Sequence, residues 1–393
     1  MSLNKVKLGL LPRIVIAIAL GIVGGLLLPE WIQRIFATFN SLFGNFLNFF
    51  VPLLIVGLIV PGIANVGRNA GKLLLVTLTI AYTFTVLSGM YTWGFCELIY
   101  PTLLDGAELK VVEQAESGFT PYFVIDMPPI MGVMSALVAS FLIGMGITAI
   151  NGESLRGVFN DFQDIILLTI SKVVIPLLPL YIFGIFLSIS SSEQILSVLG
   201  LFIKLILVIF LFTALLLVLQ FSVAGIVARR NPFKMLKSML VAYVTALGTQ
   251  SSAATIPVTL EQTIKNGVNP SIAGFVIPLC ATIHLSGSTT KITACAIAIM
   301  MMLGMDIDPI TIVGFIFMLG ITMVAAPGVP GGAIMASIGV LQSILGFDQT
   351  SIALMIALYI AMDSFGTAAN VTGDGAIAVI IDKLSRKHNM GEK

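Results

Sequence analysis

Residues 352–381 read IALMIALYIAMDSFGTAANVTGDGAIAVII, an apolar stretch long enough to cross a bilayer. Its middle carries Asp363, Thr367, Asn370 and Asp374. Successive helical residues are about 100° apart, so positions spaced +4, +7 and +11 from Asp363 fall within roughly 60° of one another. A carboxylate near the bilayer centre costs at least ~2.5–3.5 kcal/mol, so it is kept only where it faces a cavity, a partner or a ligand. This polar stripe is the best candidate for a binding site.

The composition is that of a membrane protein. Hydrophobic residues make up 58% of the 393 residues, charged residues only 10%, and the mean hydropathy is +1.07. Soluble domains average roughly a quarter charged residues. We therefore expect an all-α integral membrane protein whose partner is the lipid bilayer, with no nucleic-acid partner. The three cysteines lie in or beside apolar runs without metal-ligand spacing, so we assign them to core packing and expect no cofactor.

Six apolar runs in the first part of the chain are predicted to be spanning helices. They cover 8–29, 38–64, 71–96, 129–150, 160–190 and 197–228. Most of the basic residues fall in alternate connections, and if these connections lie in the cytoplasm, both termini do too by the positive-inside rule. These residues are Lys5, Lys7, Arg13, Arg68, Lys72, Arg156, Arg229, Arg230, Lys234, Lys237, Lys265, Lys383, Arg386, Lys387 and Lys393. The polar segment 105–120 is predicted to be an external loop, and the first apolar run a retained span.

Two later segments are too interrupted to be ordinary spans. They are 244–259, VTALGTQSSAATIPVT, and 324–337, VAAPGVPGGAIMAS. Non-helical backbone at membrane depth survives only where it is buried in protein or lines an aqueous cavity, so both are predicted to be re-entrant hairpins. Each is followed by an apolar helix, 270–303 or 351–383, which forms a weak inverted repeat. Interrupted segments at corresponding places in two halves indicate a transporter binding site.

The helix from Pro270 is itself interrupted by polar residues between His284 and Lys291. Unwinding there would free carbonyls for a cation; the alternative is a kinked helix whose hydroxyls bond to the preceding turn. A buried Lys291 needs a carboxylate, and Asp363 or Asp374 would supply it if the helices cross. Snorkelling is the other interpretation of Lys291. His284 either handles a proton or is hydrogen-bonded structure.

The hairpin tips have different chemistry. Ser251 and Ser252, with nearby threonines, offer hydroxyls and amides to a carboxylate ligand, whereas plain packing of small residues would not require so many hydroxyls. The glycines of the second tip, Gly328, Gly331 and Gly332, suit a mobile lid. Lys172 and Lys204 lie within earlier spans and receive no function.

Four motifs identify a family. They are TQSSAATIPVT at 249–259, PLCATIHLSGS at 278–288, APGVPGGAIM at 326–335 and DSFGTAANVTGD at 363–374. With them the chain resembles, over essentially its whole length, the dicarboxylate/amino acid:cation symporters, which include archaeal aspartate and neuronal glutamate transporters. The resemblance implies eight transmembrane helices plus two re-entrant helical hairpins, an elevator mechanism, a homotrimer, and the plasma (inner) membrane of a prokaryote.

The resemblance also implies a division of the chain into a scaffold and a transport domain. Scaffold helices 1 and 2 would occupy 1–70, and transport-domain helix 3 with the external loop 71–128. Scaffold helices 4 and 5 would occupy 129–190. The remaining transport domain, from helix 6 through hairpin 1, helix 7 and hairpin 2 to helix 8, would occupy 191–393.

By the same resemblance Asp363 would hold the substrate amino group, and Thr367 and Asn370 would contact the substrate. Amides around Ser251 and Ser252 would hold its α-carboxylate. The extracellular gate would be formed by Gly328, Val329 and Gly331. A cation site, able to take a sodium ion at Asp374, would be completed by carbonyls of Asn370 and of the break at 282–286. The coupling residues implied are Thr282, His284, Ser286, Lys291, Asn370 and Asp374.

Departures from the family pattern bear on the substrate. Members that carry acidic substrates place an arginine where this chain has Gly366, or at the first hairpin where it has Gln250, and an arginine pairs bidentately with a carboxylate. The expected substrate is therefore a small neutral amino acid such as serine, threonine or alanine. The alternative is an acidic amino acid or a dicarboxylate, with Lys291 in place of the arginine.

Departures also bear on the coupling ion, which we expect to be sodium, a proton or both. Sodium-driven relatives read Asn-Met-Asp-Gly-Thr where this chain has His284 to Ser288, and present hydroxyls where it has Ile80 and Ala81. Hard cations need oxygen ligands, so fewer sodium ions per cycle are expected. Either Lys291 replaces a lost cation, or His284 and Lys291 carry a proton.

Two other function classes were weighed. An intramembrane serine hydrolase could use His284 with Ser251, Ser286 or Ser288, but no nucleophile motif is present and Ser286 lies only two residues from His284. A channel would favour a continuous polar pore, whereas the polar groups here converge on one site closed by two hairpins. We therefore expect a transporter and not an enzyme.

Overall fold

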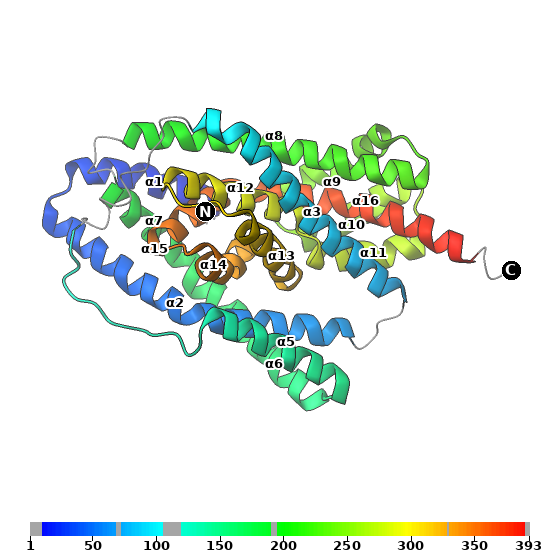
Figure 1. Cartoon of the computed structure of the whole chain (residues 1–393), viewed down its shortest axis with the longest axis horizontal. Helices are drawn as coiled ribbons and strands as arrows, with labels where there is room; N and C mark the ends of the chain where they lie inside the picture. Colours follow the sequence, from blue (N-terminus) through cyan, green and yellow to red (C-terminus); the bar gives the residue numbers. More distant parts are fainter. Residues whose placement is uncertain (1–9, 68–71, 105–118, 190–194, 328–329, 390–393) are drawn as a thin grey trace, which may run out of the picture.

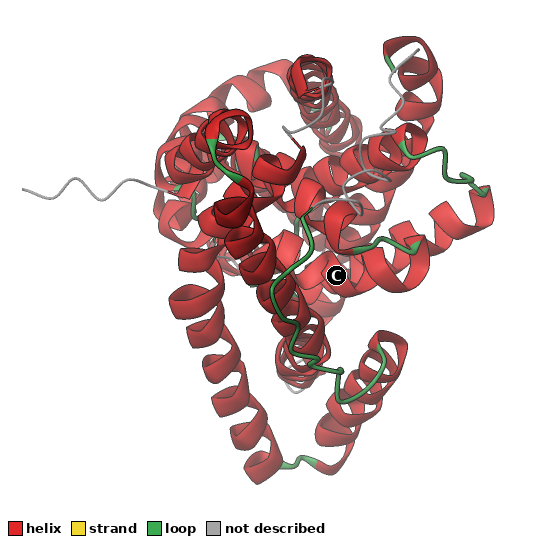
Figure 2. Cartoon of the chain, turned by 90° about the vertical axis from the view of Figure 1, so that its left-hand side faces the viewer, coloured by secondary structure: helices red, strands yellow, loops and turns green. Residues whose placement is uncertain are grey.

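The computed structural model describes residues 10–67, 72–104, 119–189, 195–327 and 330–389, and all regular structure among them is helical (Figure 2). The helices are α1 (Leu10–Leu27), α2 (Glu30–Gly67), α3 (Lys72–Leu103), α5 (Val133–Ile150), α6 (Glu153–Thr169), a π-helical turn η1 (Ile170–Val174), α7 (Ile175–Ile189), α8 (Ile195–Ala228), α9 (Pro232–Thr249), α10 (Ser252–Lys265), α11 (Pro270–Ile283), α12 (Ser286–Met302), α13 (Pro309–Ala325), α14 (Gly332–Leu345), α15 (Gln349–Ala361) and α16 (Asp363–Asn389).

Five described segments are long and apolar enough to cross a bilayer, or six if the bent pair α15 and α16 is one span. The five are Glu30–Ala64, Leu73–Leu103, Glu153–Ser188, Gly200–Ala228 and Pro270–Met302. The expectation of a multi-pass helical membrane protein is thereby confirmed. The helix predicted for 129–150 begins only at Val133, because the prolines at 128 and 129 disfavour a helix before Gly132.

The N-terminal helices and the later helices form two packing groups. Helix α1 packs along α7, and α2 packs against α5, α6 and α7. In the other group α12 packs against α3, and α16 against α8, α9, α10 and α11. Figure 1 shows α8 along one edge, α2 and α5 along the other, and α12 to α15 between them. The polar helices α12 and α16 are therefore enclosed by protein.

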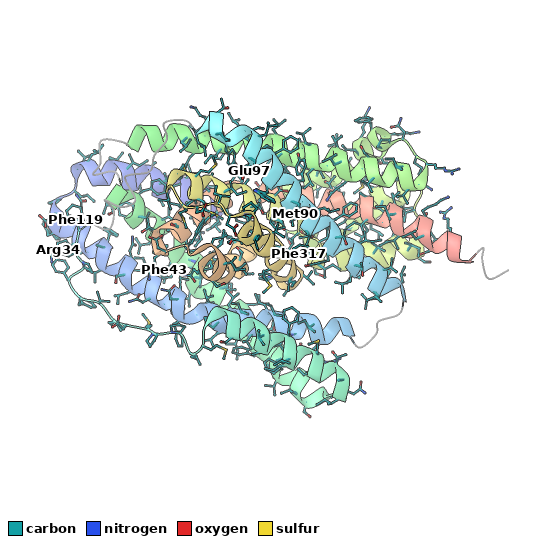
Figure 3. The ribbon with its side chains drawn as sticks, viewed as in Figure 1. Arg34, Phe43, Met90, Glu97, Phe119 and Phe317 are labelled. Carbon is teal, nitrogen blue, oxygen red and sulfur yellow. The ribbon has the colours of Figure 1, made fainter. Side chains whose placement is uncertain are left out.

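The non-helical segment before α5 is fastened to α2. The Arg34 Nε–H donates to the Thr120 carbonyl at 3.1 Å, and the guanidinium lies 4.5 Å from the ring centroid of Tyr122. Figure 3 labels Arg34 on α2. The Tyr122 amide donates to the Thr38 hydroxyl at 2.9 Å. Of the predicted external loop, residues 105–118 lie outside the described part of the chain.

Both interrupted segments form helical hairpins. Helix α9 ends at Thr249 and α10 begins at Ser252, with Gln250 in the left-handed region at φ 53°. Ser251 caps α10 by accepting the Ala254 amide at 3.3 Å. The second hairpin turns between α13 and α14 through Gly331, whose φ of 74° favours glycine.

The break between α11 and α12 is shorter than predicted. Only His284 and Leu285 leave the helix, because the Leu285 carbonyl already accepts the amide and the hydroxyl of Thr289 at 2.9 and 3.1 Å. The predicted unwinding over 284–291 is therefore wrong beyond Leu285.

A continuous helix over 352–381 is also wrong. Helix α15 ends at Ala361, and α16 starts at Asp363 after a 63° bend. The whole polar stripe from Asp363 to Asp374 nevertheless lies on α16, so its members still share one helix face.

Candidate functional site

Asp363 lies where three elements meet. It is the first residue of α16 and 9% exposed. Its Oδ2 accepts the Gly331 amide of the second hairpin at 2.8 Å, and its Oδ1 lies 3.5 Å from Lys291 Nζ of α12. The first turns of α14 and α16 carry unpaired amides and the positive ends of their helix dipoles, which favour a carboxylate here.

Lys291 is buried at 1% exposure, which rules out snorkelling. Its Nζ donates to the Met362 carbonyl at 3.2 Å and lies 3.8 Å from the ring centroid of Tyr359. The bend before α16 brings that carbonyl to the lysine. Of the two carboxylates considered from sequence, Asp363 is the partner of Lys291 and Asp374 is not.

Gly366 provides the room for this lysine. A Cβ atom built on Gly366 would overlap Cε and Nζ of Lys291. Lys291 can therefore take this position only if residue 366 has no side chain.

Asn370 joins α16 to the start of α12. Its Oδ1 accepts the amides of Gly287 and Ser288 at 2.8 and 3.3 Å, and its Nδ2 donates to Ser288 Oγ at 3.1 Å. The Tyr359 hydroxyl donates to the same Ser288 Oγ at 3.0 Å. Asn370 thus satisfies amides that the first turn of α12 would otherwise leave unpaired.

Asp374 is paired inside the protein as well. Its Oδ1 lies 2.9 Å from His284 Nδ1, and both residues are 1% exposed. On the other side of the imidazole, Gln220 Nε2 lies 3.4 Å from His284 Nε2 and donates to Ser286 Oγ at 2.9 Å. The Ser88 hydroxyl donates to the Ser286 carbonyl at 3.0 Å.

These bonds test how well the site fits a sodium ion. The side-chain oxygens beside the predicted carbonyl ligands are engaged, because Asn370 Oδ1 accepts two amides and Ser286 Oγ accepts the Gln220 amide. Among the predicted carbonyls, that of Ser286 accepts the Ser88 hydroxyl. The imidazole also occupies one Asp374 oxygen. A full set of hard oxygen ligands is therefore not assembled at this position in the structure.

The remaining predicted residues are less connected. Among the described hydrogen bonds none joins Ser251 or Ser252 to α16, although α10 packs against that helix. Thr367 is half-buried. Thr282 is exposed and its hydroxyl donates to the Leu279 carbonyl at 2.8 Å, so its side chain lies outside the cluster. Gly328 and Val329 lie outside the described residues.

Three contact residues were not predicted: Gln220, Tyr359 and Ser88. Gln220 had a detectable signal, since it is the one amide side chain in the apolar run of α8. Tyr359 and Ser88 read as ordinary residues of apolar helices, and only the crossing of α3, α12 and α15 gives them polar partners.

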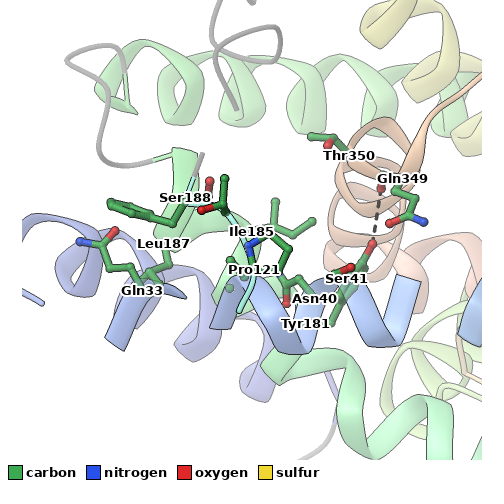
Figure 4. Close-up of a pocket in the computed structure, with 14 residues that line it drawn as sticks. Gln33, Asn40, Ser41, Pro121, Tyr181, Ile185, Leu187, Ser188, Gln349 and Thr350 are labelled. Atoms are coloured by element: carbon green, nitrogen blue, oxygen red, sulfur yellow. Dashed lines mark hydrogen bonds between the residues drawn. The ribbon is translucent and has the colours of Figure 1, made fainter. Parts of the chain in front are cut away.

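Two cavities lined by described residues lie away from this cluster. A polar cavity of about 310 Å³ is lined by residues of α2, α7 and α15, including Gln33, Asn40 and Gln349 (Figure 4). An apolar cavity of about 730 Å³ lies between α2, α3, α5 and α13. Neither is lined by Asp363, Lys291 or Asp374.

Comparisons with known proteins agree with the motifs. A model of the sodium:dicarboxylate symporter family matches residues 10–384. The serine/threonine transporter SstT of Acinetobacter baumannii (strain AYE) is 28% identical over 98% of both chains, and SstT of Acinetobacter baylyi is 26% identical over 97% of this chain and 98% of its own. Excitatory amino acid transporter 3 of Mus musculus is 36% identical over 41% of this chain and 31% of that protein.

Proposed function

The chain belongs to the sodium:dicarboxylate symporter family, and on that basis we propose that it is a cation-coupled secondary transporter of a small neutral amino acid. The relatives that match its whole length are named serine/threonine transporters. Neither Gly366 nor Gln250 supplies the arginine that acidic substrates require in this family. Serine, threonine and alanine are the proposed substrates.

The observation that carries the proposal is the position of Asp363. A buried carboxylate is held between the start of α16 and the tip of the second hairpin. The amino group of a substrate would replace the Gly331 amide or the Lys291 ammonium as its partner. Replacing the amide separates the hairpin tip from α16, so binding at Asp363 would be linked to movement of hairpin 2.

We also propose the family's larger architecture for this chain: eight spans with two re-entrant hairpins, a homotrimer, an elevator mechanism and cytoplasmic termini. The two packing groups support a division into a scaffold of α1, α2, α5, α6 and α7 and a moving part formed by the other helices. The basic residues at 229–237 and 383–387 support the orientation of the termini. The bacterial relatives support a prokaryotic plasma membrane.

The driving ion is proposed to be sodium, with fewer sodium ions per cycle than in relatives that carry the full ligand set. The His284 imidazole occupies an oxygen of Asp374 that a cation would use. A bound sodium ion would add the positive charge on which substrate binding depends, so that substrate uptake follows the sodium gradient across the membrane. A proton gradient is the other driving force to be tested.

A second candidate, an acidic amino acid or dicarboxylate, is favoured by one observation. The Lys291 ammonium occupies the space beside Gly366, where a side chain at 366 would lie. It could meet a substrate carboxylate there as a point charge.

Uptake into proteoliposomes tests both candidates. Labelled serine, threonine, alanine and aspartate would each be offered under an inward sodium gradient, an inward proton gradient, and no gradient. The proposal predicts accumulation of the neutral amino acids above equilibrium with a sodium gradient. Accumulation of aspartate alone would support the second candidate, and no gradient-driven uptake of any of them would contradict both.

A further inference from the structure

Lys291 lies inside the proposed substrate site, but the proposed function gives it no contact with a neutral substrate. Its ammonium is enclosed by three groups: the Met362 carbonyl at 3.2 Å, Asp363 Oδ1 at 3.5 Å and the Tyr359 ring at 3.8 Å from the centroid. An ammonium has three N–H donors, a number that equals the three groups around it. A change at any partner releases a buried donor.

The position of the ammonium relates it to the substrate. Asp363, Gly366 and Asn370 are three to seven residues apart and share one face of α16. Because a Cβ at 366 would overlap Cε and Nζ of Lys291, the ammonium covers this face between the proposed amino-group anchor and Asn370. A substrate held at Asp363 by its amino group would have its Cβ substituent beside the lysine.

We propose that Lys291 selects the side chain of the substrate by requiring an oxygen acceptor on it. When the substrate amino group takes Asp363, the Lys291 donor that faced this carboxylate loses its partner. A hydroxyl on the substrate side chain gives this donor a new acceptor, whereas the methyl group of alanine leaves a buried cationic donor unpaired. The substrates are therefore hydroxyl amino acids, serine and threonine, ahead of alanine. This inference rests on the proposed function and narrows it.

A hydroxyl suits the lysine better than a carboxylate does. The ammonium keeps its bonds to Met362 and Tyr359, so only the donor released from Asp363 is available. An arginine guanidinium pairs with both oxygens of a carboxylate at once, and a lysine ammonium cannot do so in that bidentate geometry. The site therefore fits a single-oxygen acceptor.

The test compares Lys291→Met with Gly366→Ala. Methionine is one atom shorter than lysine, keeps most of its apolar stem and has no donor. The ratio of maximal uptake rate to KM should fall about tenfold to a hundredfold for serine, the loss of one hydrogen bond to a charged group. The same ratio for alanine should not fall and should rise, because the variant removes the buried donor that alanine leaves unpaired.

Gly366→Ala tests the same contact with the charge retained. Its methyl group displaces the ammonium, so serine should again lose its advantage over alanine. In the double variant, Lys291→Met with Gly366→Ala, the methionine adapts to the added methyl group. The losses of serine uptake in the two single variants should therefore not add. Lys204→Met, at an exposed lysine of α8, is the matched control and should leave both substrates unchanged.

The outcomes separate the inference from the proposed function. Equal loss for serine and alanine in Lys291→Met would mean that the lysine is only structural and would overturn the inference. So would a wild-type protein that does not prefer serine to alanine, or one that prefers aspartate to both. If the wild type shows no gradient-driven amino-acid uptake, the proposed function itself fails. Should Lys291→Met not fold, Gly366→Ala decides between these outcomes.

Discussion

At the scale of single residues, two of the three carboxylates of α16, Asp363 and Asp374, are each paired with a nitrogen-bearing side chain of the helix break or of α12. Asp363 faces Lys291 at 3.5 Å, and Asp374 faces His284 at 2.9 Å. The first pair contacts the tip of the second hairpin through Gly331, and the Asp363 side chain is 13% exposed. The second is closed, with both side chains 1% exposed or less. We therefore assign substrate binding to the first pair and structural or coupling roles to the second.

Breaking the closed pair should cost stability. In His284→Leu, Asp374 keeps its position but loses its buried partner, which typically destabilises a protein by about 3–5 kcal/mol. Unfolding of the purified protein in detergent would measure it. Replacing both residues, His284→Leu with Asp374→Leu, should recover part of the loss, because no charge is then left unpaired.

A matched control is the exposed pair of Glu261 and Lys265, whose atoms lie 2.7 Å apart. Glu261→Gln should change unfolding little, because exposed ion pairs contribute little. If His284→Leu is as stable as Glu261→Gln, the buried pair is not what holds α11 and α16 together here.

The sequence predicted what kind of partner a residue needs better than it predicted which residue supplies that partner. A lysine in the middle of an apolar segment requires a carboxylate, and Asp363 was one of two choices. The direct pairing of His284 with Asp374 was not predicted, although the family resemblance placed both residues at one cation site. Helix periodicity shows which side chains share a face, but not which faces meet.

At the scale of elements, interruptions of apolar sequence predicted where helices end. Both hairpins and the break before α12 were predicted, since hydroxyls, glycines and prolines inside apolar runs need partners that lipid does not offer. Their extent was predicted less well. The bend at Met362 has no proline or glycine beside it, so the sequence carried no signal for it.

The turn of the second hairpin offers a test of gating. Gly331 and Gly346 both have positive φ, 74° and 70°, at the two ends of α14, and neither has atoms close to an added Cβ. Alanine strains both equally, by about 1–2 kcal/mol. Alanine keeps the N–H at 331, but the strain there falls on the amide that donates to Asp363, so Gly331→Ala should slow uptake while Gly346→Ala should not. Equal uptake by the two variants would show that the Gly331 contact has no part in transport.

The helix break offers a test of ion coupling. His284→Asn together with Ser286→Asp restores the residue types that sodium-driven relatives have at these positions, adding oxygen ligands and removing the imidazole from Asp374. Uptake by this variant should depend more steeply on sodium concentration than uptake by the wild type. An unchanged sodium dependence would contradict our account of why this chain needs fewer sodium ions.

At the scale of the whole molecule, α2 meets the second hairpin region through amide side chains. Gln342 Nε2 donates to Asn48 Oδ1 at 2.9 Å, and Gln349 Nε2 donates to Asn45 Oδ1 at 3.3 Å. Such uncharged hydrogen bonds contribute roughly 1 kcal/mol each. They can therefore stabilise one position of the hairpin region against α2 and still break when it moves. An interface of this kind suits two bodies that slide past each other.

A cross-link across this interface tests the sliding motion. Asn48→Cys with Gln342→Cys places thiols at two side chains that are in contact, while the native cysteines at 96, 280 and 295 are buried. If α14 moves relative to α2 in each cycle, oxidation should abolish uptake and a reductant should restore it. The single-cysteine variants should be insensitive to both treatments. Full uptake by the cross-linked protein would contradict an elevator motion at this interface.

The central claim is that Asp363 binds the amino group of the transported amino acid. Its most direct test is the affinity of the purified protein for L-serine and for L-glycerate, which carries a hydroxyl in place of the amino group, in saturating sodium. We predict that the wild type binds serine more tightly than glycerate and that Asp363→Ala removes this difference, while Glu261→Gln retains it. An Asp363→Ala variant that still prefers serine to the same degree would contradict the claim.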